Sequence, residues 1–129
     1  MAYTDTASTK LLLGLSGSGD DALLSTLITA AQAAIDLHFL RTFEASANTT
    51  RHFDASRDVS GRRLNLDRDL CAVNSVTNGD GTTVTTAQYT LLPRNDTPYY
   101  AIQLLSSAGI SWTYEDDPEG AIAISGKWA

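Results

Sequence analysis

The sequence predicts an α+β fold in a single domain, 1–129, with a helical part at residues 1–44 and a β-rich part at residues 45–129. Up to about residue 43, apolar side chains recur at spacings of three and four residues, which is the period of an amphipathic helix. From residue 51 onward they alternate or form short runs between turns, which is the pattern of strands. We therefore expect a short helix and one long helix, then a compact antiparallel β-sheet or small barrel-like region.

The short helix is expected to end at Leu13, because a glycine and a Gly/Ser-rich run follow it. Thr6 or Ser8 is the expected N-cap, since a hydroxyl oxygen can accept a bond from a free N–H group of the first turn. The glycines within residues 14–19 also suggest a phosphate-binding loop. No predicted strand precedes them and no Lys-Ser or Lys-Thr pair follows, so an interhelical turn is the favoured interpretation.

The long helix is expected over residues 19–43. Asp20 and Asp21 stand at its start, where carboxylates interact favourably with the exposed N–H groups. Ala33 and Ala34 belong to a smooth, Ala-rich middle that allows another backbone to approach closely. We expect the helix to serve packing against a neighbour and not catalysis. Its expected apolar face comprises Leu24, Leu27, Ile28, Ala31, Ile35 and His38 or Phe39.

Seven strands are predicted in the second part of the chain. They are expected at residues 50–54, 63–66, 70–77, 83–92, 99–105, 110–114 and 121–125. Residues 78–81, Asn-Gly-Asp-Gly, are typical of a tight hairpin connection because they tolerate positive φ. Residues 93–98 and 116–120 contain prolines and are expected to form longer turns.

The composition excludes several classes of function. With 15 acidic and 9 basic residues the net charge is −6, which argues against DNA binding by the chain alone. Cys71 is the one cysteine, so no internal disulfide is expected and a reducing compartment is favoured. The apolar run at residues 11–13 is far too short for a membrane span. We expect a soluble protein that is made in the cytoplasm.

No constellation in the sequence predicts catalysis, and no catalytic, cofactor-binding or metal-binding residue is assigned. A nucleophilic pair would have to bring Cys71 to His38 or His52, and nothing local supports it. An acidic run near the C-terminus could bind a hard cation such as calcium, although a solvated turn is the favoured interpretation. Paired carboxylates for glycoside hydrolysis also stay open, without a predicted aromatic groove. The run consists of Glu115, Asp116, Asp117 and Glu119.

An Arg/Asp-rich segment at residues 51–69 holds more than half of all basic residues. Arginine forms forked, two-bond contacts with carboxylates, so this mixture suits a specific protein interface. An ordinary solvated loop and hairpin is the alternative. The candidate interface residues are Arg57, Arg62, Arg63, Asp67, Arg68 and Asp69, together with Ala33 and Ala34 of the long helix.

In its order of motifs the chain resembles the head–tail connector (adaptor) proteins of tailed double-stranded DNA bacteriophages. The resemblance spans nearly the whole chain and includes no catalytic signature. It is carried by the run Asp20 to Leu24, by Ala30 to Asp36, by Leu70 to Gly81 with its Val-Thr-Asn-Gly-Asp-Gly turn, by Gln88 and Tyr89 before Pro93, by Pro98 to Ile102 and by Asp117 to Ile122.

The resemblance implies a virion protein of the neck, between capsid and tail, and not an enzyme. Many copies would form a ring under the portal protein, often twelvefold to match it. The ring would extend the channel through which double-stranded DNA passes without specific binding, and would dock the next neck or tail protein. No cofactor and no membrane are implied.

One departure from that family and two alternatives accompany the resemblance. Longer relatives continue into further helices after the strand equivalent to residues 121–128, so we expect a shorter member or a fragment. A different virion component, for head closure or tail completion, is the first alternative. The second is a small β-rich binding or hydrolytic domain that uses the acidic run as a metal site.

Overall fold

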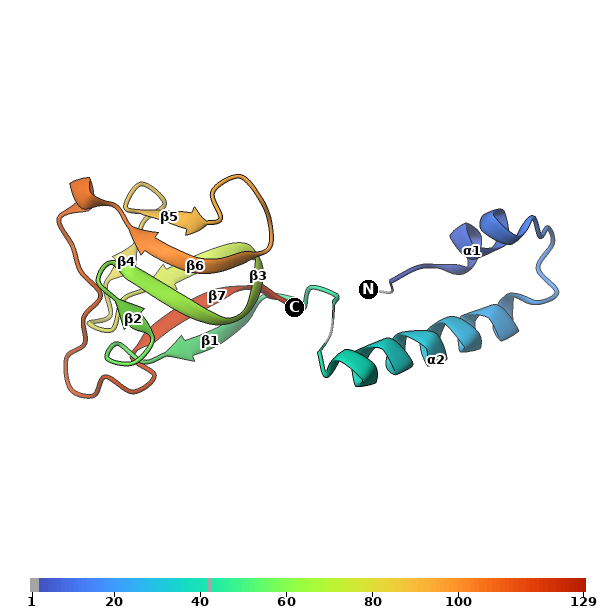
Figure 1. The fold of residues 1–129 in the computed structure, drawn as a ribbon, viewed down its shortest axis with the longest axis horizontal. Helices are drawn as coiled ribbons and strands as arrows, with labels where there is room; N and C mark the ends of the chain where they lie inside the picture. The colour runs from blue at the N-terminus through green and yellow to red at the C-terminus, as the bar shows by residue number, and fades with distance from the viewer. Residues whose placement is uncertain (1–2, 42) are drawn as a thin grey trace. The chain divides into compact units, whose positions relative to one another are not determined.

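The computed structural model describes residues 3–41 and 43–129, and it separates the chain into two compact units, Met1–Ala45 and Ser46–Ala129 (Figure 1). We call the first the helical unit and the second the β unit. Two helices make up the regular structure of the helical unit, and a seven-stranded antiparallel sheet forms the β unit. The predicted α+β class is confirmed, as is the order of one short helix, one long helix and a β-rich region.

Helix α1 spans Thr6–Leu13 and ends where the sequence predicts. Gly14 follows it in the left-handed conformation, at φ 70°, which a residue without Cβ adopts at little cost. The predicted N-cap was wrong. Asp5 is the cap, because its carboxylate accepts the Ser8 N–H at 2.7 Å while Thr6 is already helical.

Helix α2 spans Asp21–Phe39, so its predicted end at residue 43 was four residues too late. The helix stops at Leu40, which adopts the left-handed conformation at φ 55° although it is not glycine. The N–H groups of Leu40 and Arg41 both donate to the Asp36 carbonyl and thereby close the last turn. At the other end Asp20 occupies the N-cap position and Asp21 lies in the first turn, as the acidic start predicts.

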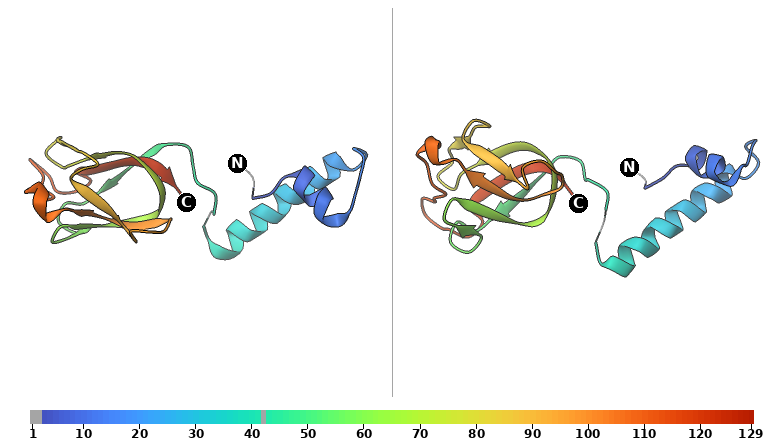
Figure 2. Two further views of the ribbon diagram at one scale, coloured as in Figure 1. Left: turned by 90° about the horizontal axis from the view of Figure 1, so that it is seen from above. Right: turned by 45° about the horizontal axis from the view of Figure 1, so that its top comes forward.

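The β unit is one sheet in the order β1-β7-β3-β6-β5, and the short β2 and β4 pair with β3 (Figure 1). The central β3 is long enough to pair with β6 through its first half and with β7 through its second half. Figure 2 shows the strands curling around a common interior. The strands are β1 Thr49–Phe53, β2 Val59–Ser60, β3 Arg63–Thr77, β4 Thr83–Val84, β5 Tyr89–Leu92, β6 Tyr99–Leu104 and β7 Ile122–Trp128, with a short 3-10 helix η1 at Ser106–Ala108.

Several strand boundaries differ from the prediction. The two strands expected at 63–66 and 70–77 are one strand with a register shift between Asn65 and Leu70, and β2 was not predicted. The strand expected at 83–92 is interrupted by a turn in which Gln88 N–H donates to the Thr85 carbonyl at 2.9 Å. Residues 110–114 form no strand beyond a single bridge between Tyr114 and Gly79.

The core of the β unit lies inside the curled sheet. Along β7 every second residue is buried, and Gly126 belongs to that inward-facing series. A Cβ at Gly126 would lie 2.3 Å from the Ala72 carbonyl oxygen, so glycine allows β7 and β3 to approach closely. The core cluster comprises Phe53, Leu64, Leu70, Val76, Val84, Ile102, Leu104, Trp112, Ile122, Ile124 and Trp128.

Candidate functional site

The Arg/Asp-rich segment forms one forked ion pair within its own chain. Arg51 of β1 donates from Nη2 to Asp67 Oδ2 at 2.7 Å and from Nε to Asp67 Oδ1 at 3.1 Å. Hydrogen bonds from Arg51 lower the pKa of the Asp67 carboxyl below its usual value, with the guanidinium charge acting in the same direction. Arg51 also lies 5.8 Å from the centre of the Trp128 ring. Asp67 therefore helps to fix the β unit internally.

The other predicted interface residues of this segment fall into two groups. Arg57 lies in the turn before β2, with its side chain 81% exposed and its Nε 3.6 Å from Asp54 Oδ2. Arg62, which donates to Ser106 Oγ, and Arg63 lie at the start of β3. Arg68 and Asp69 lie in the irregular stretch of β3, where the Asp69 carbonyl accepts the Ala129 N–H at 2.9 Å. We call Arg57, Arg62 and Arg63 the hairpin arginines.

Ala33 and Ala34 are exposed on α2, as a helix-packing surface requires. Beyond Asp21 in the first turn, the half-buried positions of the same helix are Ile28, Gln32 and Asp36, which follow the buried Leu24 at intervals of four residues. Ala34 therefore lies on the far side of α2 from this stripe, where a neighbouring backbone can approach.

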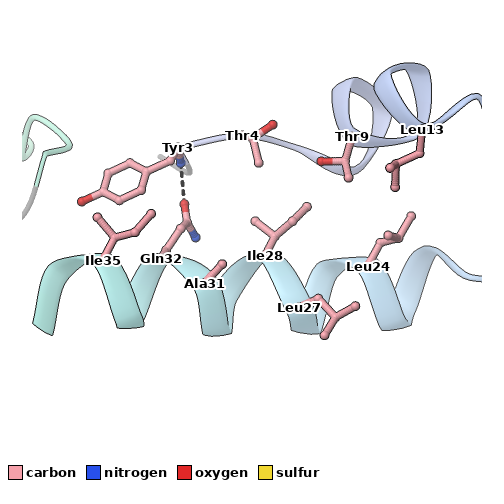
Figure 3. A pocket seen from close by; sticks show the side chains of 10 residues that line it. All are labelled: Tyr3, Thr4, Thr9, Leu13, Leu24, Leu27, Ile28, Ala31, Gln32 and Ile35. Carbon is pink, nitrogen blue, oxygen red and sulfur yellow. Dashed lines mark hydrogen bonds between the residues drawn. The ribbon is translucent and has the colours of Figure 1, made fainter. Parts of the chain in front are cut away.

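An apolar groove runs along the half-buried side of α2 (Figure 3). The space measures about 360 Å³, and Figure 3 shows Leu13, Leu24, Ile28 and Ile35 directed toward it, while Leu27 points away. One wall belongs to α2 and the other to the N-terminal segment before and within α1. The lining residues are Tyr3, Thr4, Thr9, Leu13, Leu24, Leu27, Ile28, Ala31, Gln32 and Ile35.

Tyr3 forms two hydrogen bonds to α2 and one to the segment that follows it. Its N–H donates to Gln32 Oε1, its hydroxyl donates to Asp36 Oδ1, and the hydroxyl oxygen accepts the Phe43 N–H at 2.7 Å. Partial burial and the bond to Asp36 raise the pKa of the Tyr3 hydroxyl. The Tyr3 ring also meets the Phe43 ring edge to face, with centroids 6.4 Å apart.

The helical unit leaves most of its large apolar side chains in solvent. Among its described residues Leu24, at 9% exposed, is the single buried one. Leu12 and Leu40 are 86% and 85% exposed, although leucine is among the residues most often buried. The exposed set is Leu11, Leu12, Leu13, Leu15, Leu23, Leu27, Ile35, Leu37, Phe39, Leu40 and Phe43. Of the predicted apolar face of α2, Leu24 is buried and Ile28 is half-buried, whereas its other members stay exposed.

Within the β unit the structure does not bring Cys71 next to His52. Cys71 lies on β3 near the residues that pair with Trp128 and Lys127, whereas His52 pairs with Ala123. Ala123 in turn pairs with Thr77 of β3. Six residues of strand, roughly 20 Å, thus separate the levels of the two side chains. His38 lies in the helical unit, beside the Phe39 ring at 4.9 Å between centroids.

Neither ion-binding candidate from the sequence forms a described site. The acidic run at residues 115–119 is exposed, and no three His, Cys, Asp or Glu side chains within 3–41 and 43–129 come close enough to hold a metal ion. In the interhelical turn Lys10 Nζ donates to the Gly17 carbonyl and lies 2.9 Å from Asp21 Oδ1. An intramolecular ion pair therefore occupies the region where the sequence suggested a phosphate.

By length and composition alone α2 could cross a lipid bilayer. Core helices of soluble proteins and signal sequences also meet these criteria, but only a small part of α2 is buried in this structure.

Comparisons of the chain with protein-family models, with curated proteins and with solved structures found no match. The apolar face expected for α2 includes every α2 residue that lines the groove except Gln32, which is polar and does not follow the apolar period. The wall formed by Tyr3, Thr4, Thr9 and Leu13 was not predicted, because a lone tyrosine before a short helix has no periodicity that would reveal its role.

Proposed function

We propose that the chain is a structural protein of a phage neck, a head–tail connector that forms a ring under the portal protein. The ring extends the DNA channel and offers a docking surface to the next neck or tail component. The single observation that carries the proposal is the apolar surface of the helical unit, where eleven large side chains are at least 40% exposed. Exposure of this many large apolar side chains is typical of proteins that assemble. The motif order in the sequence directs the proposal to the neck.

The charge of the chain supports a conduit for DNA. Residues 1–45 hold five acidic and two basic side chains, and residues 46–129 hold ten and seven, so both units are net negative. A ring of such chains repels phosphate on average, and a duplex can slide past it without being held. No cofactor and no enzymatic activity belong to this proposal, and the protein acts in the virion after synthesis in the host cytoplasm.

Ring closure needs heterologous contacts, in which one surface meets a different surface of the neighbour. The hairpin arginines and Arg68 provide one candidate surface, and the exposed Ala33 and Ala34 of α2 provide another. The exposed acidic run at residues 115–119 has the charge that would complement the arginines of an adjacent copy.

Mass measurement with the cognate portal protein tests the proposal. Purified chain and portal, mixed at micromolar concentration, should give a stoichiometric complex whose added mass corresponds to a closed ring, often of twelve copies. If both proteins are folded and remain separate over the whole concentration range, the connector proposal is wrong. The proposal also predicts that electron cryomicroscopy of particles shows density for the chain directly below the portal. Density elsewhere in the neck would indicate a different virion component.

A pair of charge reversals tests the proposed interface. Arg62→Glu with Arg63→Glu should reduce ring formation at least tenfold, because two exposed cations of the contact become anions. Lys127→Glu is the matched control, since Lys127 is also exposed but lies outside the Arg/Asp-rich segment. Equal assembly of all three proteins would place the subunit contact elsewhere.

A further inference from the structure

We propose that the apolar groove of the helical unit binds an amphipathic α-helix with an aliphatic face and a basic polar face. This inference does not depend on a role in a phage neck. It rests on the lining of the groove, on its length along α2 and on the charge of the surrounding surface.

The lining of the groove calls for an apolar occupant. Leu24, Ile28 and Ile35 from α2 converge with Leu13 from α1 on one open space (Figure 3). Ile35 and Leu13 remain 40% and 59% exposed, so water covers apolar surface that a partner could cover instead. Removing such surface from water is the main favourable contribution to association.

The shape of the groove favours a helix over an extended segment. From Leu24 to Ile35 it follows α2 over twelve residues, roughly 16 Å or three helical turns. An extended peptide would leave backbone N–H and C=O groups facing apolar walls, because Gln32 Oε1 already accepts the Tyr3 N–H. A helix satisfies these groups internally and presents side chains at spacings of three and four residues.

The surrounding charge favours a basic polar face. Residues 1–45 contain only two cationic side chains, and one of them, Lys10, is paired with Asp21. The same residues contain five acidic side chains, which are Asp5, Asp20, Asp21, Asp36 and Glu44. A helix with Lys or Arg beside its aliphatic face would neutralise this excess. The same excess argues against a second copy of the helical unit as the occupant, since two such surfaces repel each other.

A lipid bilayer fits the groove less well than a helix. Gln32 and Asp36 lie in the same stripe of α2 as Leu24 and Ile28, and both bind Tyr3. A bilayer would surround α2 on every side and place Asp36 near hydrocarbon, which is costly for a carboxylate. A docked helix covers the apolar side chains and leaves that polar end in water.

Calorimetric titration of the full chain with a synthetic amphipathic peptide of leucine and lysine tests the proposal. We expect saturable binding of one peptide per chain. A scrambled peptide of the same composition should bind at least tenfold more weakly, because it has the same charge without an apolar face. A peptide with glutamate in place of lysine should also bind at least tenfold more weakly. Equal binding of the scrambled peptide would overturn the groove, and equal binding of the glutamate peptide would overturn the basic face.

Two variants locate the binding site on α2. Ile28→Asp should weaken binding of the lysine peptide at least tenfold, even though its new charge attracts lysine. Leu12→Asp is the matched control, because Leu12 is exposed on α1 but does not line the groove, and it should bind like the unaltered chain. Ala31→Trp fills the groove without adding a charge and should also block binding. This second variant keeps the test valid if Ile28→Asp unfolds α2. Unchanged binding by Ala31→Trp in a folded protein would overturn the proposal.

Two further measurements separate the other occupants. Co-sedimentation with neutral phosphatidylcholine vesicles that depends on Ile28, without peptide binding, would assign the surface to a bilayer. Concentration-dependent dimers that Ile28→Asp abolishes and that excess peptide does not dissociate would assign it to a second copy. Either result would overturn the proposal, whereas displacement of such dimers by the lysine peptide would support it.

Discussion

The β unit and the helical unit differ in how they treat apolar side chains. Eleven side chains of the β unit form one cluster in which none is more than 7% exposed. In the described part of the helical unit only Leu24 is buried, and Leu11 and Leu12 are more than 80% exposed. An apolar pattern therefore identifies which side of a helix or strand is apolar, but it does not identify what covers that side.

Helix length explains why the helical unit cannot cover itself. Helix α1 has 8 residues and α2 has 19, which correspond to roughly 12 Å and 28 Å of helix. The shorter helix therefore reaches only part of the longer one, and the extended segment at Tyr3 and Thr4 covers a further part. In the β unit, by contrast, β3 pairs with four other strands, so segments far apart in the sequence enclose one core.

The largest expected effect comes from removing a buried leucine of the β unit, and an exposed leucine of the helical unit provides the comparison. Leu64→Ala deletes a side chain with no exposed surface and should lower the free energy of unfolding by about 2–5 kcal/mol. Leu27→Ala removes a leucine that is 55% exposed and should change stability by no more than about 0.5 kcal/mol. Urea denaturation followed by tryptophan fluorescence reports the β unit, because Trp112 and Trp128 both lie there. Circular dichroism at the helical band reports α2.

A large effect of Leu27→Ala would contradict the difference in burial between the two units. If the substitution cost as much as Leu64→Ala, the helical unit would have a covered core in solution. A dependence of that cost on protein concentration would show that other copies supply the cover.

An intermediate effect is expected at Asn78, the one buried polar residue of the described chain. Its Oδ1 accepts the N–H groups of Gly79 and Thr113 at 2.8 and 3.0 Å, and its Nδ2 donates to the Ser111 carbonyl at 2.9 Å. Asn78→Ala leaves these backbone groups without that partner and should cost about 1–3 kcal/mol in thermal or urea unfolding. Asn74→Ala is the control, because Asn74 is exposed and bonds only Ser125 Oγ, at 3.2 Å. Equal costs would mean that water replaces the Asn78 bonds.

Local signals predicted much of the fold. Gly14 marked the end of α1 correctly, the acidic pair Asp20 and Asp21 placed the start of α2 within two residues, and the residues 78–81 do connect the paired strands β3 and β4. The end of α2 was missed because Leu40 adopts a left-handed conformation without the usual glycine. The irregular course of residues 110–114 depends on Trp112, whose Nε1 donates to the Arg62 carbonyl fifty residues away at 2.8 Å. No local pattern encodes that contact.

The candidate surfaces were predictable only in part. Helical periodicity identified Leu24, Ile28 and Ile35 as one face, and all three line the groove. What covers that face was not predictable, because the apolar periodicity is the same for a helix packed in a core and for a helix that binds another protein. The pairing of Asp67 with Arg51 depends on how β3 lies against the rest of the sheet, so composition could only suggest arginine and aspartate contacts in general.

The smallest expected effect concerns the Arg51–Asp67 pair and tests whether charge, as well as packing, stabilises the β unit. Because the pKa of Asp67 is lower in the folded chain, its ionised form stabilises the fold above the unfolded pKa of about 3.9. This contribution is lost as the pH falls through the folded pKa. Asp67→Asn should therefore lower stability at pH 7 by up to about 1 kcal/mol, since the side chain is 56% exposed. The difference from the unaltered chain should shrink below about pH 4. Thermal unfolding from pH 7 to pH 3 measures it, with Asp116→Asn in the exposed acidic run as the control. A difference that stays constant over this range would show that Asp67 acts through packing and not through its charge.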